Sequence, residues 1–348
     1  MRKLKLVVVG PGLIGKQHIR LINENANCEL YAIVAPDHDI NHEIARAQKV
    51  RLFHSLDECL DSGSIDGVII SSPNQFHADQ ARLCIEADIP VLIEKPITVS
   101  VADGEVLANL AAQKDAKVLV GHHRAHSPLL SLARTVINEG RLGRLVTVMG
   151  SAQFYKPAHY FEDGPWRREI GGGPILINLI HEIGNLRSLC GEIAAVQALT
   201  SSAIRGFPVE DTVVINLIFS NGTLGTFVLS DTSATAKSWE QTSRENPSYP
   251  TYPDEDCYTI TGTEGSLAIP TMRLKYYGKG ITPSWWTPFS EETLDIERYD
   301  PLTCQLNHFI QVIERKCEPL VSAADGLRNL QVTEAVRASA ATKQIVYV

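Results

Sequence analysis

The segment that begins at Leu4 constrains the fold more than any other part of the chain. Residues 4–9 (LKLVVV) form a short apolar run, which is typical of a strand buried on both faces of a parallel sheet. A glycine-rich turn follows at residues 10–15 (GPGLIG), and residues 14–22 have the amphipathic spacing of a helix. Strand, GxGxxG turn and helix therefore occur in the order that predicts a dinucleotide-binding unit.

Each glycine of this turn has a separate purpose. Gly10 permits the tight turn, Gly12 removes the side chain that would block a pyrophosphate, and Gly15 lets the helix approach the strand. The helix N-terminus then presents unpaired N–H groups and a positive partial charge to the phosphates. We therefore expect Gly10, Gly12, Leu13, Ile14 and Gly15 to bind NAD or NADP.

Further short apolar runs support the same reading of the first third of the chain. They alternate with helical patterns, which predicts a doubly wound α/β unit over residues 1–122. A glycine turn in some other α/β domain is the alternative. The runs are at 29–35, 67–71, 90–93 and 117–120, and the helical patterns are at 75–87 and 101–114.

The residues after the second run leave the choice between NAD and NADP open. An acidic residue that binds the adenosine ribose is expected about twenty positions after the last glycine, and this position holds Ala35. Asp37 follows two residues later and is a possible substitute, so we expect Ala35 and Asp37 to lie at the ribose. Lys16 and His38 offer positive charge for a 2′-phosphate, although both residue types are commonly solvated.

Three further motifs resemble one known family. Residues 71–77 (SSPNQFH), 94–96 (EKP) and 171–184 (GGGPILINLIHEIG), in this order after the GxGxxG turn, resemble the Gfo/Idh/MocA oxidoreductases over essentially the whole chain. The resemblance implies that Ser72, Pro73, Asn74 and His77 flank the dinucleotide. It also implies that Glu94 and Lys95 lie beside the nicotinamide ribose.

The resemblance further implies two catalytic residues, Lys95 and His181. Chemistry supports the lysine independently, because oxidation of an alcohol releases a proton as well as a hydride and needs a titratable group near the oxygen. The alternative for Lys95 is a solvated lysine in a surface turn. The chain departs from the family at Ile177 and Gly184, where related enzymes carry aspartates, and Asn178 can bind a substrate but cannot act as a base.

Polar residues in the second part of the chain are candidates for substrate binding. The resemblance places His123, Arg124, Trp166, Arg167 and Asn178 together with His181 near the substrate. It also places the segments that carry Lys156 and Arg168 near the same cavity, although a solvated surface position is an equal alternative for Arg168. Guanidinium groups bind carboxylates in a bidentate manner, which favours a sugar acid or hydroxy acid.

We expect no metal site in this chain. Three histidines, His122, His123 and His126, lie close together in the sequence, but no acid or cysteine completes a ligand set there. The resemblance instead implies that their polar segment lies against the substrate.

Residues 123–348 predict a second α/β domain for substrate binding and oligomerisation. From residue 144 onward, strand patterns follow one another without helices, and Asn221-Gly222 is a strong hairpin signal. These features predict a large, mostly antiparallel open sheet, whose free face we expect to form a homodimer or homotetramer. Residues 238–253 are a candidate lid or arm, and the helix predicted over 323–342 is expected to pack back toward the first domain.

Composition excludes several classes of protein. The formal charge of the 348-residue chain is −8 and its Lys and Arg residues are dispersed, which argues against nucleic-acid binding. The first apolar run is too short for a secretory signal or a membrane span. The seven cysteines show no paired spacing, which suits reduced thiols, and we expect a cytoplasmic protein with a small-molecule substrate.

Together, these features predict an NAD(P)-dependent dehydrogenase that acts on CH–OH groups. Hydride transfer would connect the nicotinamide with a secondary alcohol of a sugar-like, sugar-acid or cyclic hydroxy-acid substrate. Two alternatives remain: a glycoside hydrolase that oxidises its sugar transiently and restores the cofactor, and a non-catalytic dinucleotide-binding sensor.

Overall fold

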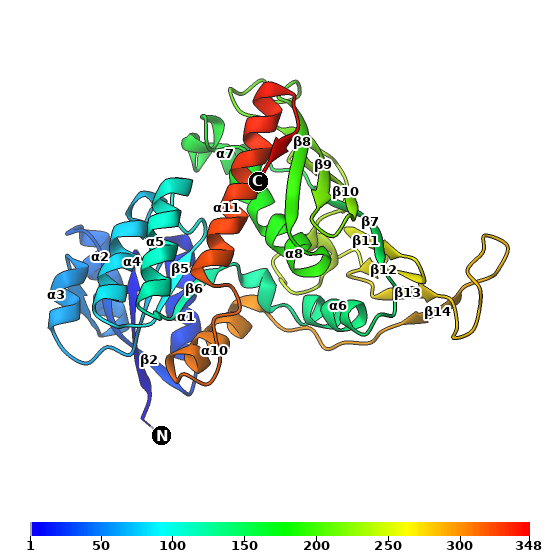
Figure 1. Ribbon diagram of the computed structural model, residues 1–348. Helices are drawn as coiled ribbons and strands as arrows, with labels where there is room; N and C mark the ends of the chain where they lie inside the picture. The colour runs from blue at the N-terminus through cyan, green and yellow to red at the C-terminus, as the bar shows by residue number, and fades with distance from the viewer. Residues whose placement is uncertain (1) are drawn as a thin grey trace. The chain divides into compact units, whose positions relative to one another are not determined.

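The structure, a computed structural model, describes residues 2–348 and divides them into two compact units (Figure 1). Unit 1 contains the chain up to His126 together with residues 301–330. Unit 2 contains residues 127–300 and 331–348. Each unit is built around its own sheet and its own hydrophobic core.

Unit 1 is a doubly wound α/β unit, as the alternating pattern predicts. Its six strands are all parallel and lie in the order β3-β2-β1-β4-β5-β6. The order reverses between β1 and β4, and ligands of such sheets bind beyond the strand ends at this reversal. The strands are β1 (Leu4–Val9), β2 (Cys28–Val34), β3 (Arg51–Phe53), β4 (Gly67–Ile70), β5 (Val91–Glu94) and β6 (Val118–Gly121).

Helices flank this sheet, with α4 against α5 and α1 against α10 (Figure 1). Every residue of β4, β5 and β6 is buried, which explains their continuous apolar sequences. The predicted strands and helices of this unit are confirmed to within about two residues, whereas α2, α3, α10 and β3 were not predicted. The helices are α1 (Leu13–Glu24), α2 (Asp39–Gln48), α3 (Leu56–Asp61), α4 (His77–Glu86), α5 (Val101–Gln113) and α10 (Pro301–Ile313), with short turns η1 (Asn74–Phe76) and η2 (His123–His126).

Unit 2 contains a nine-stranded sheet in the order β14-β13-β12-β11-β7-β10-β9-β8-β15. Only β7 and β10 pair in parallel, so the prediction of a large, mostly antiparallel sheet is confirmed. The strands are β7 (Leu145–Gln153), β8 (Ile193–Ser201), β9 (Thr212–Phe219), β10 (Leu224–Ser230), β11 (Tyr258–Gly262), β12 (Gly265–Ile269), β13 (Arg273–Tyr276), β14 (Ser290–Thr293) and β15 (Val346–Tyr347).

One face of this sheet is buried and the other is open. Burial alternates residue by residue along β9, and Asn221-Gly222 forms the predicted hairpin between β9 and β10, with Gly222 at φ +86°. The buried face belongs to a core that also contains side chains of α6 (Pro128–Asn138) and α8 (Ile180–Cys190). Two short helices, α7 (Ala158–Glu162) and α9 (Trp239–Thr242), also belong to this unit.

Helix α11 (Ala323–Thr342) contributes residues to both units. In unit 1, a Cβ at Gly326 would lie 2.7 Å from a methyl of Val120, so the helix and β6 are in close contact there. The Val120 N–H also donates to the Val321 carbonyl at 2.8 Å. In unit 2, the Ser339 hydroxyl accepts the Ala198 N–H at 2.9 Å.

The first half of the candidate lid, residues 238–253, belongs to the core of unit 2. Trp239 is 3% exposed, and its indole N–H donates to the buried Glu245 carboxylate at 2.9 Å. Ser127 donates to the same carboxylate. Only the second half carries exposed aromatic side chains, at Tyr249 and Tyr252.

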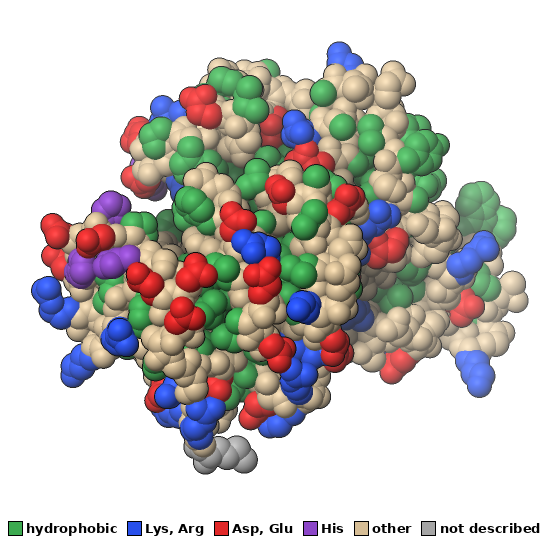
Figure 2. Space-filling model, turned by 60° about the vertical axis from the view of Figure 1, so that its left-hand side comes forward, with side chains coloured by type: hydrophobic (Ala, Val, Ile, Leu, Met, Phe, Trp, Pro, Cys, Tyr) green, Lys and Arg blue, Asp and Glu red, His purple; other side chains and the backbone are tan. Residues whose placement is uncertain are grey.

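On the face displayed in Figure 2, acidic and basic side chains are interspersed, and histidine side chains gather at one edge. Within residues 2–348, no helix has the length and apolar character needed to cross a bilayer.

Candidate functional site

The loops after β1 and β4 are locked together at the strand-order reversal. Gly10 has φ +82°, and a Cβ there would lie 2.6 Å from the Ser72 Cα, so only glycine fits. The Ser71 hydroxyl lies 2.9 Å from the Val9 carbonyl oxygen and 2.8 Å from that of Gly10. The turn after β1 is therefore held in one conformation.

Gly12 and Gly15 differ in what surrounds them. A Cβ at Gly15 would lie 2.1 Å from the Gly10 carbonyl oxygen, so this glycine is required for the fold itself. A Cβ at Gly12 would meet no heavy atom of the described chain within 4 Å beyond its sequence neighbours. Gly12 is also the N-cap of α1, and it provides no side-chain cap to the helix N–H groups. Open space beside uncapped N–H groups fits a pyrophosphate.

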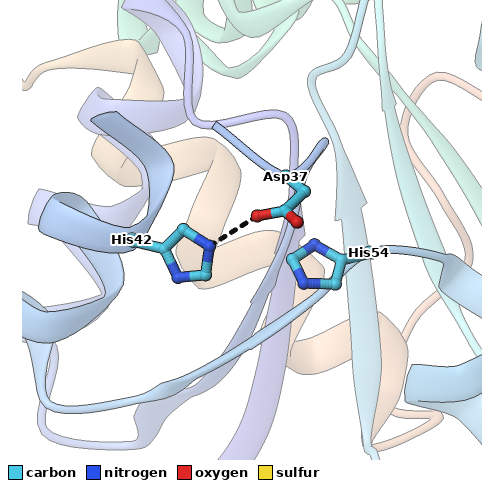
Figure 3. A group of neighbouring side chains, drawn as sticks. All are labelled: Asp37, His42 and His54. Atoms are coloured by element: carbon cyan, nitrogen blue, oxygen red, sulfur yellow. Dashed lines mark hydrogen bonds and ion pairs between the residues drawn. The ribbon is translucent and has the colours of Figure 1, made fainter. Parts of the chain in front are cut away.

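The end of β2 places a carboxylate at the edge of unit 1. Ala35 is buried and its N–H donates to the Phe53 carbonyl at 3.0 Å, whereas Asp37 is exposed. The Asp37 Oδ1 lies 2.7 Å from the His42 Nε2, and His54 completes the group (Figure 3). The hydrogen bond from His42, with a further contribution from the charge of His54, lowers the pKa of Asp37.

A buried pair lies at the end of β5. Glu94 is 7% exposed, and its Oε1 lies 2.8 Å from the Nε2 of His18, which is 1% exposed on α1. The second oxygen, Oε2, is 3.3 Å from the Lys95 backbone nitrogen, which donates to it. A Cβ at Gly121 would lie 3.0 Å from the Glu94 Cδ, so the glycine that ends β6 makes room for this carboxylate.

His77 connects the segment after β4 with the segment after β5. It is fully buried at the start of α4, with Nδ1 2.8 Å from the Pro96 carbonyl oxygen and Nε2 2.9 Å from that of Ser72. The imidazole therefore joins the backbone at Ser72 to the backbone at Pro96, which directly follows Lys95. Pro73 and Asn74 are exposed in the segment between Ser72 and His77.

Lys95, His123 and Arg124 share one electrostatic environment in unit 1. Lys95 follows β5 and His123 follows β6, and these strands pair with Glu94 opposite Gly121. Burial lowers the pKa of His123 well below its usual range, and the charges of Arg124 and Lys95 lower it further. His123 is consequently neutral at pH 7, and three of the expected functional residues are brought together.

Unit 2 contains a buried lysine, Lys156, at the centre of a polar cluster. Lys156 is 9% exposed, and its Nζ donates to the Asn178 Oδ1 at 2.8 Å. The same Nζ lies 3.6 Å from the Asp231 Oδ2 and 4.9 Å from the centre of the Tyr160 ring. Arg205 occupies the other side of Asp231, with its Nε 2.7 Å from Oδ1.

Burial lowers the pKa of Lys156 to about 8, although the nearby Asp231 carboxylate acts in the opposite direction. The charges of Arg205 and Arg167 add to the decrease. Lys156 can therefore lose or gain a proton near physiological pH, which an exposed lysine cannot do.

The other expected residues of unit 2 lie on three short elements. Arg167 stacks over the Tyr160 ring at 4.0 Å and donates to the Tyr160 carbonyl, and Trp166 beside it is 57% exposed. Asn178 belongs to a π-helical turn (Ile175–Leu179), which also contains Ile177. His181 is 8% exposed in the first turn of α8.

Glu210 explains the glycine run before this turn. Its Oε1 accepts the Ile175 N–H at 2.9 Å, and a Cβ at Gly173 would lie only 2.3 Å from the same oxygen. Burial raises the pKa of Glu210. A side chain at Gly173 would therefore displace the carboxylate that anchors the start of the π-helical turn.

Comparison with known proteins identifies the relatives of this architecture. The sequence profile described as "Oxidoreductase family, NAD-binding Rossmann fold" matches residues 4–122. The profile described as "Oxidoreductase family, C-terminal alpha/beta domain" matches residues 134–348. The chain belongs to this Gfo/Idh/MocA family. The predictions of the family and of an NAD(P)-dependent dehydrogenase with a Rossmann domain are confirmed.

Individual members are distant in sequence but similar in length. An inositol 2-dehydrogenase of Rhizobium meliloti (strain 1021) is 24% identical over 97% of each chain. A 1,5-anhydro-D-fructose reductase of Ensifer adhaerens is 28% identical over 83% of this chain and 82% of the relative. The crystal structure of the WlbA dehydrogenase from Bordetella pertussis has a TM-score of 0.77 at 23% identity and covers 100% of this chain and 99% of its own.

Several side chains of the site did not emerge from the sequence of this family member. His18 is one of them, and its only sequence signal is a polar residue on the apolar face of the first helix. Lys156 was recognisable only as one cation among several, because its neighbour Asp231 lies far away along the chain. Glu210 was not recognisable either, because the backbone N–H that its carboxylate accepts belongs to a residue 35 positions earlier.

Proposed function

We propose that this dehydrogenase interconverts a secondary alcohol and a ketone on a sugar-like, sugar-acid or cyclic hydroxy-acid substrate, with Lys95 and His181 in proton transfer. The observation that carries the proposal is the position of Lys95, His123 and Arg124 after neighbouring strand ends, in the same unit as the open Gly12 turn. NAD(P), when bound, accepts the hydride on oxidation and returns it on reduction.

Different residues of unit 1 bind different parts of the dinucleotide in this proposal. We assign the pyrophosphate to the turn from Gly10 to Gly15 and the adenosine ribose to Asp37. Glu94 and the loop held by His77 support the nicotinamide end. The assignment of Asp37 is supported by its ionised carboxylate at the end of β2.

The proton of the substrate hydroxyl passes to the Lys95 amine in the oxidative direction. The C–H bond breaks with both electrons leaving as hydride, and the O–H bond leaves its electrons on oxygen to form the carbonyl. His181 is the second residue that we assign to proton transfer. The neutral His123 offers hydrogen bonds to substrate hydroxyls.

An acidic substrate is supported by the cations of unit 2. Lys156 and Arg167 surround the same Tyr160 ring, and Lys156 is bonded to Asn178, which is expected to bind substrate. Two structural neighbours are consistent with this choice. The WlbA dehydrogenase was crystallised with NADH and UDP-GlcNAcA, and an oxidoreductase from Agrobacterium radiobacter with NAD⁺, L-tartaric acid and magnesium.

The test is turnover of a substrate panel with each cofactor. Purified chain is mixed with NAD or NADP and with polyols, sugars, sugar acids and hydroxy acids, and reduced nicotinamide is followed by absorbance. Lys95→Ala should abolish turnover, whereas Lys114→Ala, an exposed lysine of the same unit, should not. Dinucleotide binding without turnover on any compound would favour a sensor, and aglycone release without net cofactor reduction would favour a hydrolase.

A second copy of the chain is the proposed partner of the open sheet face. Apolar side chains are exposed there on three adjacent strands: Met149 on β7, Val214 on β9 and Leu224 on β10 are 57%, 46% and 55% exposed. Met149→Glu should shift the molar mass measured by light scattering toward the monomer. The control Val106→Glu, on α5 of unit 1, should leave the mass unchanged.

A cytoplasmic location completes the proposal. Among residues 2–348 the cysteine side chains form no disulfide, which is typical of a reducing compartment.

A further inference from the structure

Three side chains from separate segments converge at the outer edge of unit 1 (Figure 3). Asp37 lies in the turn after β2, His42 in the first half of α2, and His54 directly after β3. Each offers one ligand atom, and these three atoms lie within 4.8 Å of one another. Figure 3 shows the carboxylate between the two imidazole rings, whose centroids are 5.8 Å apart.

The spacing suits a tetrahedral metal ion. Zinc binds imidazole nitrogen and carboxylate oxygen at about 2.0 to 2.2 Å, so tetrahedral ligands lie about 3.4 Å from each other. Asp37 Oδ1 and His42 Nε2 are 2.7 Å apart, and the remaining separations are at most 4.8 Å. Small side-chain rotations are therefore enough to bring all three atoms to an ion.

The backbone beneath these side chains is fixed. β2 and β3 pair in parallel up to Val34 and Phe53, and the Ala35 N–H donates to the Phe53 carbonyl at 3.0 Å. The Asn41 side chain donates to the Pro36 carbonyl at 2.9 Å, which holds the turn before α2. The ligand atoms are thus carried by segments whose relative positions are set before an ion arrives.

The ligand set also restricts the kind of ion. Two imidazoles and one carboxylate suit first-row divalent ions such as Zn²⁺, Co²⁺ or Ni²⁺, whereas Mg²⁺ and Ca²⁺ prefer oxygen ligands. The Asp37 side chain is 74% exposed and that of His42 is 44% exposed, so solvent reaches the group and water can fill the fourth position.

We propose that Asp37, His42 and His54 form a binding site for a divalent cation of the zinc class. The turn that carries Asp37 is also where the proposed function places the adenosine ribose. A second part of the inference rests on that proposed function: the metal ion and the dinucleotide compete for Asp37, so that binding of one excludes the other. Sequence analysis weighed only His122, His123 and His126 as metal ligands, and the structure groups a different set.

Direct metal binding tests the first part without any dinucleotide. The untagged chain is freed of metal by dialysis against a chelator and titrated with Co²⁺ while its visible absorption is recorded, and Zn²⁺ is then added to displace the cobalt. We expect one Co²⁺ per chain with the strong ligand-field band of a tetrahedral site. His42→Ala and His54→Ala should each weaken binding at least about tenfold.

His38→Ala is the matched control, because His38 is exposed in the same turn but lies outside the group, and it should bind Co²⁺ like the parent chain. Circular dichroism verifies that each variant is folded. No Co²⁺ binding would overturn the proposal. Equal binding by the parent chain and both alanine variants would overturn it too, and would point to another site such as Cys317 and His308, whose Sγ and Nδ1 are 3.7 Å apart.

The second part is tested by titrating NAD and NADP into metal-free and Zn²⁺-loaded chain. Zn²⁺ should weaken dinucleotide binding, and the dinucleotide should weaken Zn²⁺ binding by the same factor, because coupling between two ligands is reciprocal. Dinucleotide affinity that does not respond to Zn²⁺ would overturn this part. Failure of the dinucleotide to bind even without metal would instead count against the proposed function.

Discussion

Replacing Lys156 by methionine should stabilise unit 2 at neutral pH and impair substrate binding. Methionine has a similar length and no charge, so it removes the ammonium group from its buried position. The change of the Lys156 pKa from 10.5 to about 8 corresponds to about 3 to 4 kcal/mol, at about 1.4 kcal/mol for each pH unit. By this measure the charged lysine makes the folded state less stable at pH 7.

Two losses reduce the gain. Asn178 and Asp231 each lose a partner, which costs about 1 to 2 kcal/mol in total, although Asp231 keeps Arg205. We therefore expect Lys156→Met to raise the free energy of unfolding at pH 7 by about 1 to 3 kcal/mol. The same variant should raise the KM of an acidic substrate, because it removes a cation from the proposed substrate site.

The dependence on pH separates this explanation from a packing effect. A lysine whose folded pKa is depressed destabilises the fold below that pKa, and the penalty disappears as pH rises from 8 toward 10.5. Between pH 7 and pH 10 the stability of the parent chain should therefore rise relative to Lys156→Met by about 2 to 3 kcal/mol. The advantage of the variant should vanish or reverse at pH 10.

Urea unfolding followed by tryptophan fluorescence is the assay. All four tryptophans, at positions 166, 239, 285 and 286, lie in unit 2, so the signal reports the unit that contains Lys156. Lys279→Met, at an exposed position of the same unit, is the control and should match the parent chain. A stability difference that stays constant from pH 7 to pH 10 would refute the reasoning, since packing alone does not titrate.

Three further changes test the geometry of the two units. Gly12→Val should weaken NAD(P) binding, measured by calorimetry, by at least about tenfold and should leave urea unfolding unchanged. The valine side chain would enter space that no atom of the described chain fills and that we assign to the pyrophosphate, so equal affinity would contradict this assignment. Gly173→Ala should destabilise unit 2 by about 1 to 3 kcal/mol in the fluorescence assay, since its Cβ would lie 2.3 Å from the Glu210 carboxylate, and an unchanged midpoint would disprove this contact. His18→Leu should destabilise unit 1 by about 3 to 5 kcal/mol, because it leaves the buried Glu94 without its histidine partner. The double variant His18→Leu with Glu94→Leu should recover part of this loss in melts followed by circular dichroism, and a double variant no more stable than the single one would argue against the pair.

The sequence was sufficient for the parts of the fold that depend on local pattern. Strands β1, β4, β5 and β6 are buried on both faces, so each appears as a continuous apolar run that ends in a turn residue. The three-residue strand β3 escaped prediction because it begins with the exposed Arg51 and is too short to show a period. The four-residue strands β13 and β14 share this difficulty, since their neighbours in the sheet supply most of the evidence for them.

The positions of the site residues were predictable where one rule fixes them. Gly10, Ser72, Lys95 and His123 follow the carboxyl ends of parallel strands, and these ends meet in any doubly wound sheet. The partners of these residues were not predictable. His77 is an example, because its sequence position suggests a dinucleotide contact, whereas the structure shows both ring nitrogens at backbone carbonyls.

Lys156 is a candidate functional residue that is recognised by its cost to the stability of the fold. A lysine that is 9% exposed with a pKa of about 8 is less stable in the fold than a neutral side chain of similar size would be. The Asp231 carboxylate reduces this free-energy penalty, and Arg205 in turn partly neutralises the charge of Asp231. Two buried charges and a third, partly buried one stabilise a protein little compared with apolar packing. The presence of this charged group beside Asn178 agrees with the proposed substrate site, since perturbed and partly compensated charges concentrate where a protein binds or transforms a charged molecule.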